Sequence, residues 1–245
     1  MNDRLASAVL PPGQRIYAVG DVHGCRDQLD AMHQAIAADL RERPQGDAQG
    51  RPQGDVLVIH LGDYIDRGPD SAGVIARLLA PLVIPGVRVL NLMGNHEDML
   101  LGALAGRRVD AEVWISNGGH AALQSWGVPP RTPAKRWGEL IPAPHLAFMR
   151  GLALMHRAGG YVFVHAGVRP GLALAAQSRQ DLLWIREPFL STMVRHEAVV
   201  VHGHTPEDSM PVLRTNRIGL DTGAVLGGPL TCGVFEGERV RFLQT

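Results

Sequence analysis

The chain has 245 residues, 45% of them hydrophobic, which suits one soluble globular domain and leaves no composition bias toward disorder. Its 24 basic residues balance its 24 acidic residues, so no charge excess favours binding to bulk nucleic acid. Two cysteines are too few for a disulfide-rich secreted scaffold. No apolar run approaches the ~18 residues of a membrane span, so we expect a cytoplasmic protein without a membrane anchor.

Short apolar runs alternate with helical patterns along the first hundred residues. Five runs have the length of buried strands and lead directly into Gly-rich turns. They are Ile16–Val19, Val56–Leu61, Val87–Met93, Tyr161–Val164 and Ala198–Val201. Apolar residues recur at helical spacing from Leu29 to Leu40 and from Val74 to Leu79, the latter behind an N-cap at Asp70 or Ser71. This alternation predicts an α/β fold with ligands bound beyond the carboxyl ends of the strands.

Three other segments differ from this pattern. The pentapeptide of residues 43–47 recurs at 51–55 and indicates a surface loop. The stretch from about 103 to 160 has no clear period, and we expect a helical insertion that covers the site. The segment from Leu230 to Leu243 predicts a hairpin that turns at Glu236–Glu238. We expect one domain over residues 1–245.

A polar motif follows each of the five predicted strands. The motifs are Gly20–Gly24 (GDVHG), Gly62–Gly68 (GDYIDRG), Gly94–Glu97 (GNHE), Val164–Gly167 (VHAG) and Val201–Thr205 (VHGHT). One such motif alone is as readily a turn or a helix cap. Five of them, each behind a strand and each with Asp, Asn or His beside a glycine, indicate a single shared site.

The residue types in these motifs are those of a centre with two metal ions. Asp21 and His23 are two apart, so in extended backbone their side chains point the same way and can hold one ion. Asp63 can bridge two ions, because a carboxylate has two oxygens with spare lone pairs.

The later motifs supply the ligands of the second ion, which are Asn95, His165 and His204. A set of Asp, His and Asn without thiolate suits Mn, Fe or Zn, and ions about 3.5–4 Å apart can activate a shared water. We therefore expect two divalent ions as cofactor, Mn foremost, with Fe, Zn, Ni and Co compatible.

The motifs, in this order, resemble those of the calcineurin-like metallophosphoesterases. More narrowly, they are similar to the PPP-type serine/threonine protein phosphatases and their bacterial relatives, which include the symmetrical diadenosine tetraphosphatases. The likeness runs from Gly20 to about Thr205, with a further match at Leu220–Ala224. The wider superfamily often has a second histidine after His204; its absence here is typical of the PPP branch, and His202 is expected to pack. The resemblance implies a four-layer α/β/β/α sandwich with its metal site at the carboxyl-terminal rim of the strands.

The resemblance also implies a role for each motif residue. Ligands of the first metal would be Asp21, His23 and Asp63, and ligands of the second Asp63, Asn95, His165 and His204. His96 would be the general acid and Asp66 its orienting partner. Arg67 and Arg186 would clamp the phosphate while a metal-bridging hydroxide attacks phosphorus in line.

The substrate stays open at this point. A phosphorylated protein, cleaved at phosphoserine or phosphothreonine and with phosphotyrosine also considered, is one candidate. Diadenosine tetraphosphate or a related nucleotide polyphosphate is the alternative. It would be held by residues of the middle region, which equally fit a solvated face with buried tryptophans: Arg107, Arg108, Trp114, Arg136 and Trp137. No membrane partner is expected.

Two hypotheses of other classes have less support. A binding protein without catalysis would not need the complete set of ligands, acid and clamp. A thiol phosphatase could use Cys25 beside Arg26, but the Gly-rich spacing around them belongs to the metal motif, so a small filler is the better interpretation of Cys25. The histidines outside the motifs, with His60 inside a strand, are expected to be packing or surface residues.

Overall fold

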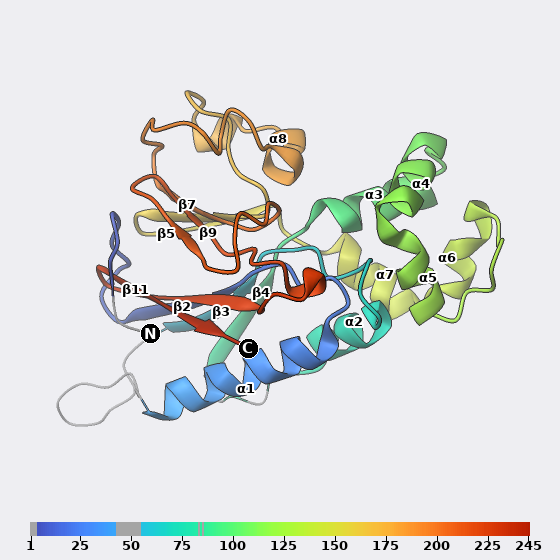
Figure 1. Cartoon of the computed structure of the whole chain (residues 1–245), viewed down its shortest axis with the longest axis horizontal. Helices are drawn as coiled ribbons and strands as arrows, with labels where there is room; N and C mark the ends of the chain where they lie inside the picture. Colours follow the sequence, from blue (N-terminus) through green and yellow to red (C-terminus); the bar gives the residue numbers. More distant parts are fainter. Residues whose placement is uncertain (1–3, 43–54, 83, 85) are drawn as a thin grey trace.

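A computed structural model describes residues 4–42, 55–82, 84 and 86–245 (Figure 1). Within these ranges two β-sheets lie face to face. The first has the strand order β1-β11-β10-β2-β3-β4. Its strands are β1 (Arg4–Leu5), β2 (Gln14–Val19), β3 (Asp55–His60), β4 (Val87–Asn91), β10 (Thr231–Glu236) and β11 (Arg239–Gln244). The strands β2, β3 and β4 are parallel, whereas β10 pairs antiparallel with both β2 and β11.

The second sheet has the order β5-β6-β7-β9-β8. Its strands are β5 (Met155–Ala158), β6 (Tyr161–Val164), β7 (Val199–His202), β8 (Val212–Leu213) and β9 (Arg217–Gly219). Here β6, β7 and β9 are parallel and the two edge strands are antiparallel to their neighbours. Each sheet therefore contains a parallel trio, and the loops that follow those trios meet at one rim.

Helices cover the outer faces of the sheets. In Figure 1, α1 (Arg26–Glu42) runs beneath the first sheet, and α8 (Arg179–Trp184) lies above the second. The helix α2 (Ser71–Leu79) begins at the N-cap Asp70, whose side chain accepts the N–H of Gly73 at 2.7 Å. The expected four-layer α/β/β/α arrangement is confirmed.

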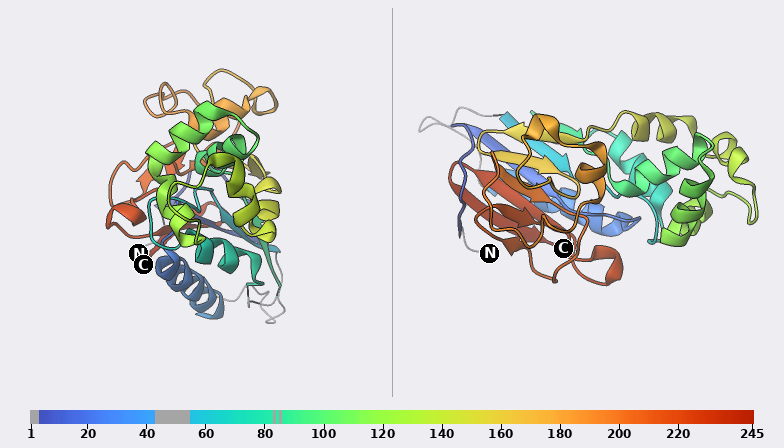
Figure 2. Two further views of the ribbon diagram at one scale, coloured as in Figure 1. Left: turned by 90° about the vertical axis from the view of Figure 1, so that its right-hand side faces the viewer. Right: turned by 90° about the horizontal axis from the view of Figure 1, so that it is seen from above.

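A group of short helices projects beyond the sheets, as the right-hand view of Figure 2 shows. It consists of α3 (Asn95–Leu104), α4 (Arg108–Trp114), a π-helical turn (Ile115–Gly119), α5 (His120–Ser125), a 3-10 turn (Ala134–Arg136), α6 (Trp137–Leu140) and α7 (Ala143–Arg150). Two further 3-10 turns lie at Leu174–Ala176 and Ala224–Leu226. The helices end at Arg150, so the last part of the expected 103–160 insertion is β5 of the second sheet.

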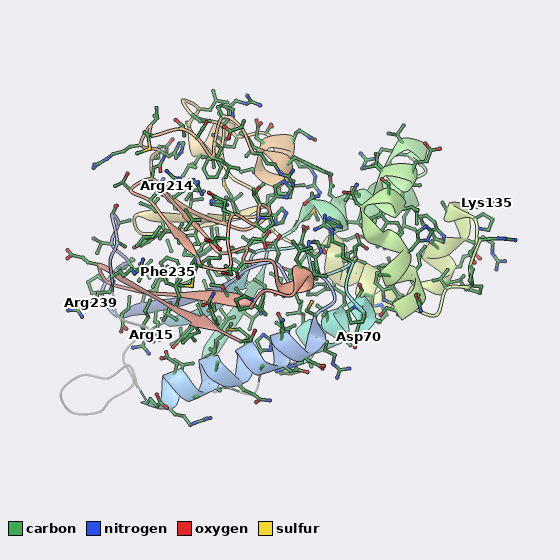
Figure 3. All side chains as sticks on the ribbon, viewed as in Figure 1. Arg15, Asp70, Lys135, Arg214, Phe235 and Arg239 are labelled. Carbon is green, nitrogen blue, oxygen red and sulfur yellow. The ribbon has the colours of Figure 1, made fainter. Side chains whose placement is uncertain are left out.

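The space between the sheets is filled by apolar and aromatic side chains. Phe235 of β10, labelled in Figure 3, contacts Tyr161 and Phe163 of β6, with ring centroids 5.1 and 5.4 Å away. A second cluster packs α1 and α2 against the first sheet, and a third packs α8 against the second. Burial of this apolar surface fixes the two sheets relative to each other and so fixes the rim at which their loops meet.

The five predicted strands, the two predicted helices and the carboxyl-terminal hairpin are confirmed, each within a few residues of its expected bounds. The prediction of a surface loop at the pentapeptide repeat falls almost wholly on residues outside those described. Among the helices of the described ranges, none is long and apolar enough to cross a membrane.

Candidate functional site

Polar residues gather where the parallel strands of both sheets end. The first sheet contributes the segments after β2, β3 and β4, and the second contributes those after β6, β7 and β9. The residues concerned are Asp21, Asp63, Asn95, His165, His204 and Asp221. The first five are at most 8% exposed, so a polar cluster is enclosed between the two sheets.

The backbone at this rim adopts conformations that side chains rarely take. Asp63 and His204 have φ of 52° and 65°, and His23 has φ of 43°. Such left-handed residues cost about 1–2 kcal/mol each and persist where the surroundings over-determine them. The neighbouring glycines permit close approach, because a Cβ added to Gly94 would lie 2.1 Å from Asp63 Oδ1, and one added to Gly203 would lie 2.0 Å from an oxygen of Asp21.

Glu97, at the start of α3, ties two of these loops together. Its Oε2 accepts the N–H groups of Asp63 and Gly94, both at 3.0 Å. Its Oε1 accepts those of Tyr64 at 2.8 Å and Ile65 at 3.3 Å. Burial, with the nearby Asp63 carboxylate, raises the pKa of Glu97 to about 7. The sequence shows this residue in the GNHE motif, but its anchoring role depends on tertiary contacts.

One group of potential metal ligands consists of His23, Asp63 and His96, whose ligand atoms all lie within 4.8 Å of one another. His23 Nδ1 lies 2.8 Å from the carbonyl of Ile65, so it is the protonated nitrogen and Nε2 has the lone pair. That Nε2 is 3.4 Å from Asp63 Oδ2 and 2.8 Å from Arg67 Nη1. Burial lowers the pKa of His23 to about 3, which keeps the ring neutral and able to bind a cation.

The second group consists of Asp63, His165 and His204, again within 4.8 Å. Asn95 Oδ1 lies 2.9 Å from His165 Nε2 and 3.0 Å from His204 Nδ1. Because His165 Nδ1 donates to the Leu61 carbonyl at 3.0 Å, its Nε2 has no proton to give to Asn95. Lone pairs that converge in this way fit a bound cation, and burial lowers the pKa of His165 to about 4 and that of His204 to about 2.

Asp21 belongs to neither group of three among the described residues. Its carboxylate instead accepts the backbone N–H of His204, with oxygen distances of 3.0 and 3.1 Å. Burial, and then the neighbouring carboxylate of Asp221, raise the pKa of Asp21 well above its usual value. Asp221 was given no role from the sequence, although it follows β9 and lies in the matched segment Leu220–Ala224. Its place in that matched segment is the signal that could have identified it, because β9, with three residues, is too short to show a strand pattern.

A buried pair of acid and base borders the first group. His96 Nδ1 lies 2.6 Å from Asp66 Oδ2, and the indole Nε1 of Trp114 donates to the same oxygen at 2.6 Å. All three side chains are 0% exposed. Burial raises the pKa of Asp66 and lowers that of His96. His96 Nε2 is buried, has no hydrogen-bond partner in the part of the chain that the structure describes, and lies 3.9 Å from Asp63 Oδ2.

A pocket of about 490 Å³ opens directly over these residues. Its floor includes Asp63, Asn95, His96 and His204, and its walls include Arg67, Trp184 and Arg186. Both arginines are exposed. A further arginine of the wall, Arg169, is held by the carboxylate of Asp181, with Nε 3.0 Å from Oδ2. The two guanidinium groups beside the candidate ligands make the floor of the pocket suitable for a phosphate dianion.

Of the middle-region residues that could have bound a nucleotide, the four whose side chains the structure describes do not line this pocket. Trp114 and Trp137 are buried against each other, with ring centroids 5.2 Å apart. Arg107 pairs with Asp110 at 2.7 Å, and Arg136 pairs with Glu139 at 3.1 Å. The side chain of Arg108 lies outside the described residues. Lys135, labelled in Figure 3, marks the outer end of this helical region, away from the sheets.

The environments of Cys25, His60 and His202 indicate structural roles for these residues. Cys25 is half-buried and burial raises the pKa of its thiol, which is unfavourable for a nucleophilic thiolate. His60 is buried between His33 and Asn91, with its Nε2 2.9 Å from His33 Nε2. His202 is buried beside Arg217. The packing interpretations of His60 and His202 agree with this geometry.

The family model of the calcineurin-like phosphoesterases matches residues 14–229. The chain is 32% identical over 235 residues to serine/threonine-protein phosphatase 1 of Salmonella typhimurium, covering 89% of this chain and 90% of that protein. It is 25% identical over 236 residues to the asymmetrical bis(5'-nucleosyl)-tetraphosphatase PrpE of Anoxybacillus flavithermus, covering 87% of each. A crystal structure of a protein provisionally described as a diadenosine tetraphosphatase superposes with a TM-score of 0.64 at 25% identity, covering 98% of both chains.

Proposed function

The chain belongs to the calcineurin-like phosphoesterase family, and we propose that within it the protein is a phosphatase for phosphoserine and phosphothreonine side chains of proteins. The observation that supports this substrate most is the open pocket, in which Arg67 and Arg186 flank the candidate metal ligands. A phosphate monoester has one phosphate group, and this single pair of arginines is enough to hold it. The 32% identity to a serine/threonine phosphatase over most of both chains supports the same choice.

We propose that the strand-end residues hold two divalent ions, with Mn as the physiological metal. The first ion would be held by Asp21, His23 and Asp63, and the second by Asp63, Asn95, His165 and His204. When bound, the ions supply Lewis acidity and lower the pKa of water, so that it attacks phosphorus at neutral pH. The neutral histidines and the converging lone pairs around Asn95 support this ligand set.

The remaining groups bind and orient the substrate. Arg67 and Arg186 each present a planar guanidinium that can hold two phosphate oxygens at once. As an imidazolium, a form that the negative charge of Asp66 favours, His96 would donate its Nε2 proton to the leaving serine or threonine oxygen and become a neutral ring, while its Nδ1–H stays bonded to Asp66. His96 lines the pocket, and its Nε2 has no hydrogen-bond partner among the described residues, which supports its assignment as the general acid.

The alternative substrate is a dinucleoside polyphosphate. It is favoured by the 25% identity to a tetraphosphatase over 87% of both chains. Such a substrate needs cations for several phosphates and a platform for a base. The buried Trp114 and Trp137 and the paired Arg107 and Arg136 supply neither, so we place this substrate second.

We further propose one catalytic domain over residues 1–245, with the helices of the 103–160 region as an insertion beside the site. The run of short helices from α4 to α7 supports this division. We propose a cytoplasmic location, which is supported by the free state of Cys25 and Cys232.

A direct comparison of substrates tests the proposed function. The Mn²⁺-loaded protein is assayed for kcat/KM on a phosphothreonine peptide and on diadenosine tetraphosphate, with Asp63→Asn as the blank. We expect the peptide to be preferred by about a hundredfold or more, equivalent to about 2.7 kcal/mol of transition-state binding. Substitution of Arg107 or Arg136 by Gln should leave kcat/KM unchanged on both the peptide and the dinucleotide. Preference for the dinucleotide, with losses in those two variants, would show that the substrate assignment is wrong.

A further inference from the structure

The carboxylate of Asp66 is held by two donors on a single oxygen. His96 Nδ1 and Trp114 Nε1 both lie 2.6 Å from Oδ2, while Oδ1 is buried and has no hydrogen-bond partner among the described residues. The backbone N–H of Asp66 donates to the hydroxyl of Ser71 at 2.9 Å. Apart from His96, Trp114 is thus the side chain that fixes where Oδ2 points.

An indole N–H is suited to this task because it can only donate. It does not titrate, so it cannot compete with His96 for the proton. The hydrogen bond from the indole favours the ionised carboxylate of Asp66, which can only accept. An accepting Oδ2 in turn keeps a proton of His96 on Nδ1. His96 lines the pocket, and its other ring nitrogen, Nε2, has no hydrogen-bond partner among the described residues, so Nε2 is the atom left to exchange a proton with the substrate.

The helical insertion holds Trp114 firmly in place. Trp114 is the last residue of α4, and the π-helical turn Ile115–Gly119 follows it directly. A Cβ added to Gly119 would lie 2.6 Å from the indole ring, so the glycine leaves room for it. The same turn presents the carbonyl of Gly118 to the backbone N–H of Arg67 at 3.2 Å. One turn of the insertion therefore contacts both the acid pair and a phosphate clamp.

We propose that Trp114 is a positioning residue, which holds Asp66 so that His96 delivers its proton to the leaving oxygen. The inference rests on the proposed role of His96 as general acid. It also gives the helical insertion a function in the reaction, because the insertion supplies the second donor to Asp66.

The test removes the indole N–H without changing the ring. Benzothienylalanine, a sulfur isostere of tryptophan that lacks the N–H, is incorporated at position 114 of the full chain, beside Trp114→Phe. The same isostere at position 126 is the matched control. Trp126 lies in the same insertion, and its Nε1 donates to His145 at 3.0 Å instead of to Asp66.

The activity readout compares two leaving groups. A threonine alkoxide needs a proton as it leaves, whereas p-nitrophenolate is a stable anion and does not. We expect the isostere at 114 to lower kcat on the phosphothreonine peptide about tenfold or more, with KM and the p-nitrophenyl phosphate rate nearly unchanged. An equal loss on both substrates, or no loss on either, would overturn the inference.

A spectroscopic readout is independent of turnover. In the Zn²⁺-loaded protein with ¹⁵N-labelled histidine, we expect the isostere at 114 to shift the Nδ1–H proton resonance of His96, and the isostere at 126 to leave it in place. An unshifted resonance at 114 would also overturn the inference. The variant His96→Asn distinguishes the proposed general-acid role of His96 from the positioning role of Trp114. If it shows no selective loss on the peptide, the proposed acid is wrong; if it shows that loss and position 114 does not, only the role of Trp114 is wrong.

Discussion

The side chain of Glu97 reaches back from the first turn of α3 to accept the backbone N–H of Asp63 at 3.0 Å. Its two oxygens together accept four backbone N–H groups from two loops. This contact holds Asp63 in its left-handed conformation, with φ of 52°. The carboxylate that we propose is shared by two ions is therefore positioned by a residue that need not touch either ion.

Replacement of Glu97 by Gln should destabilise the protein. Gln keeps the shape of the side chain, but its NH₂ group turns a donor toward two buried N–H groups. We expect a loss of about 2–4 kcal/mol in the free energy of unfolding, measured by urea denaturation. The control Glu139→Gln alters an exposed pair with Arg136 and should cost at most about 0.5 kcal/mol. Similar unfolding curves for the two variants would contradict the anchoring role.

Replacement of His96 by Asn should separate metal binding from turnover. The Asn side chain can still donate to Asp66, and the proposed ligands remain intact. We expect both ions to stay bound and kcat on a phosphothreonine peptide to fall about 10²- to 10⁴-fold, the usual contribution of a general acid. The exposed His120→Asn is the control. Loss of an ion, counted by elemental analysis, would instead make His96 a ligand.

Acid should destabilise the fold through a buried histidine pair that joins α1 to β3. His33 Nε2 lies 2.9 Å from His60 Nε2, and burial lowers their pKa values to about 4 and about 3. Both folded-state pKa values lie below the histidine pKa of about 6.5 in the unfolded chain. Between pH 6.5 and the folded-state values, the unfolded chain therefore binds more protons than the folded protein. Stability is therefore complete above about pH 6.5 and falls as the pH drops toward 4.

The variant His33→Gln checks this contribution. Gln can still donate to His60 but does not titrate. The free energy of unfolding of the variant should therefore fall less steeply with acid than that of the wild type. We expect the difference in slope to approach about 1.4 kcal/mol per pH unit for one proton, from urea unfolding at several pH values between 7 and 4.5. Parallel curves for the two proteins would contradict the assignment.

The strands and the site motifs were predictable from the sequence because both are local patterns. A parallel strand buried on both faces needs a continuous apolar run, as in Tyr161–Val164, and its ligand-bearing loop follows at once. The carboxyl ends of parallel strands meet at one edge, so the motifs could be assigned to one site before their distances were known.

Other features depend on contacts that no local pattern reveals. The strands β8 and β9 have two and three residues, too few for a period. Helices such as α6, with four residues, are defined by packing against their neighbours. The donation from Trp114 to Asp66 joins residues 48 apart in the chain, and Glu97 joins loops that meet only when the sheet forms. Sequence patterns identify the groups, and the fold determines how they are held.

We propose that Asp63 is shared by two ions at which phosphate esters are hydrolysed. The most direct measurement counts Mn²⁺ bound per chain and, on the same samples, kcat/KM for p-nitrophenyl phosphate in the wild type and in Asp63→Asn. The surface variant Asp110→Asn, which alters a pair with Arg107, is the control. We predict two ions and full activity in the wild type and the control. In Asp63→Asn, we predict the loss of at least one ion and activity at background. An Asp63→Asn protein that keeps both ions and stays within about tenfold of wild-type activity would contradict the proposed role of Asp63 as a shared ligand.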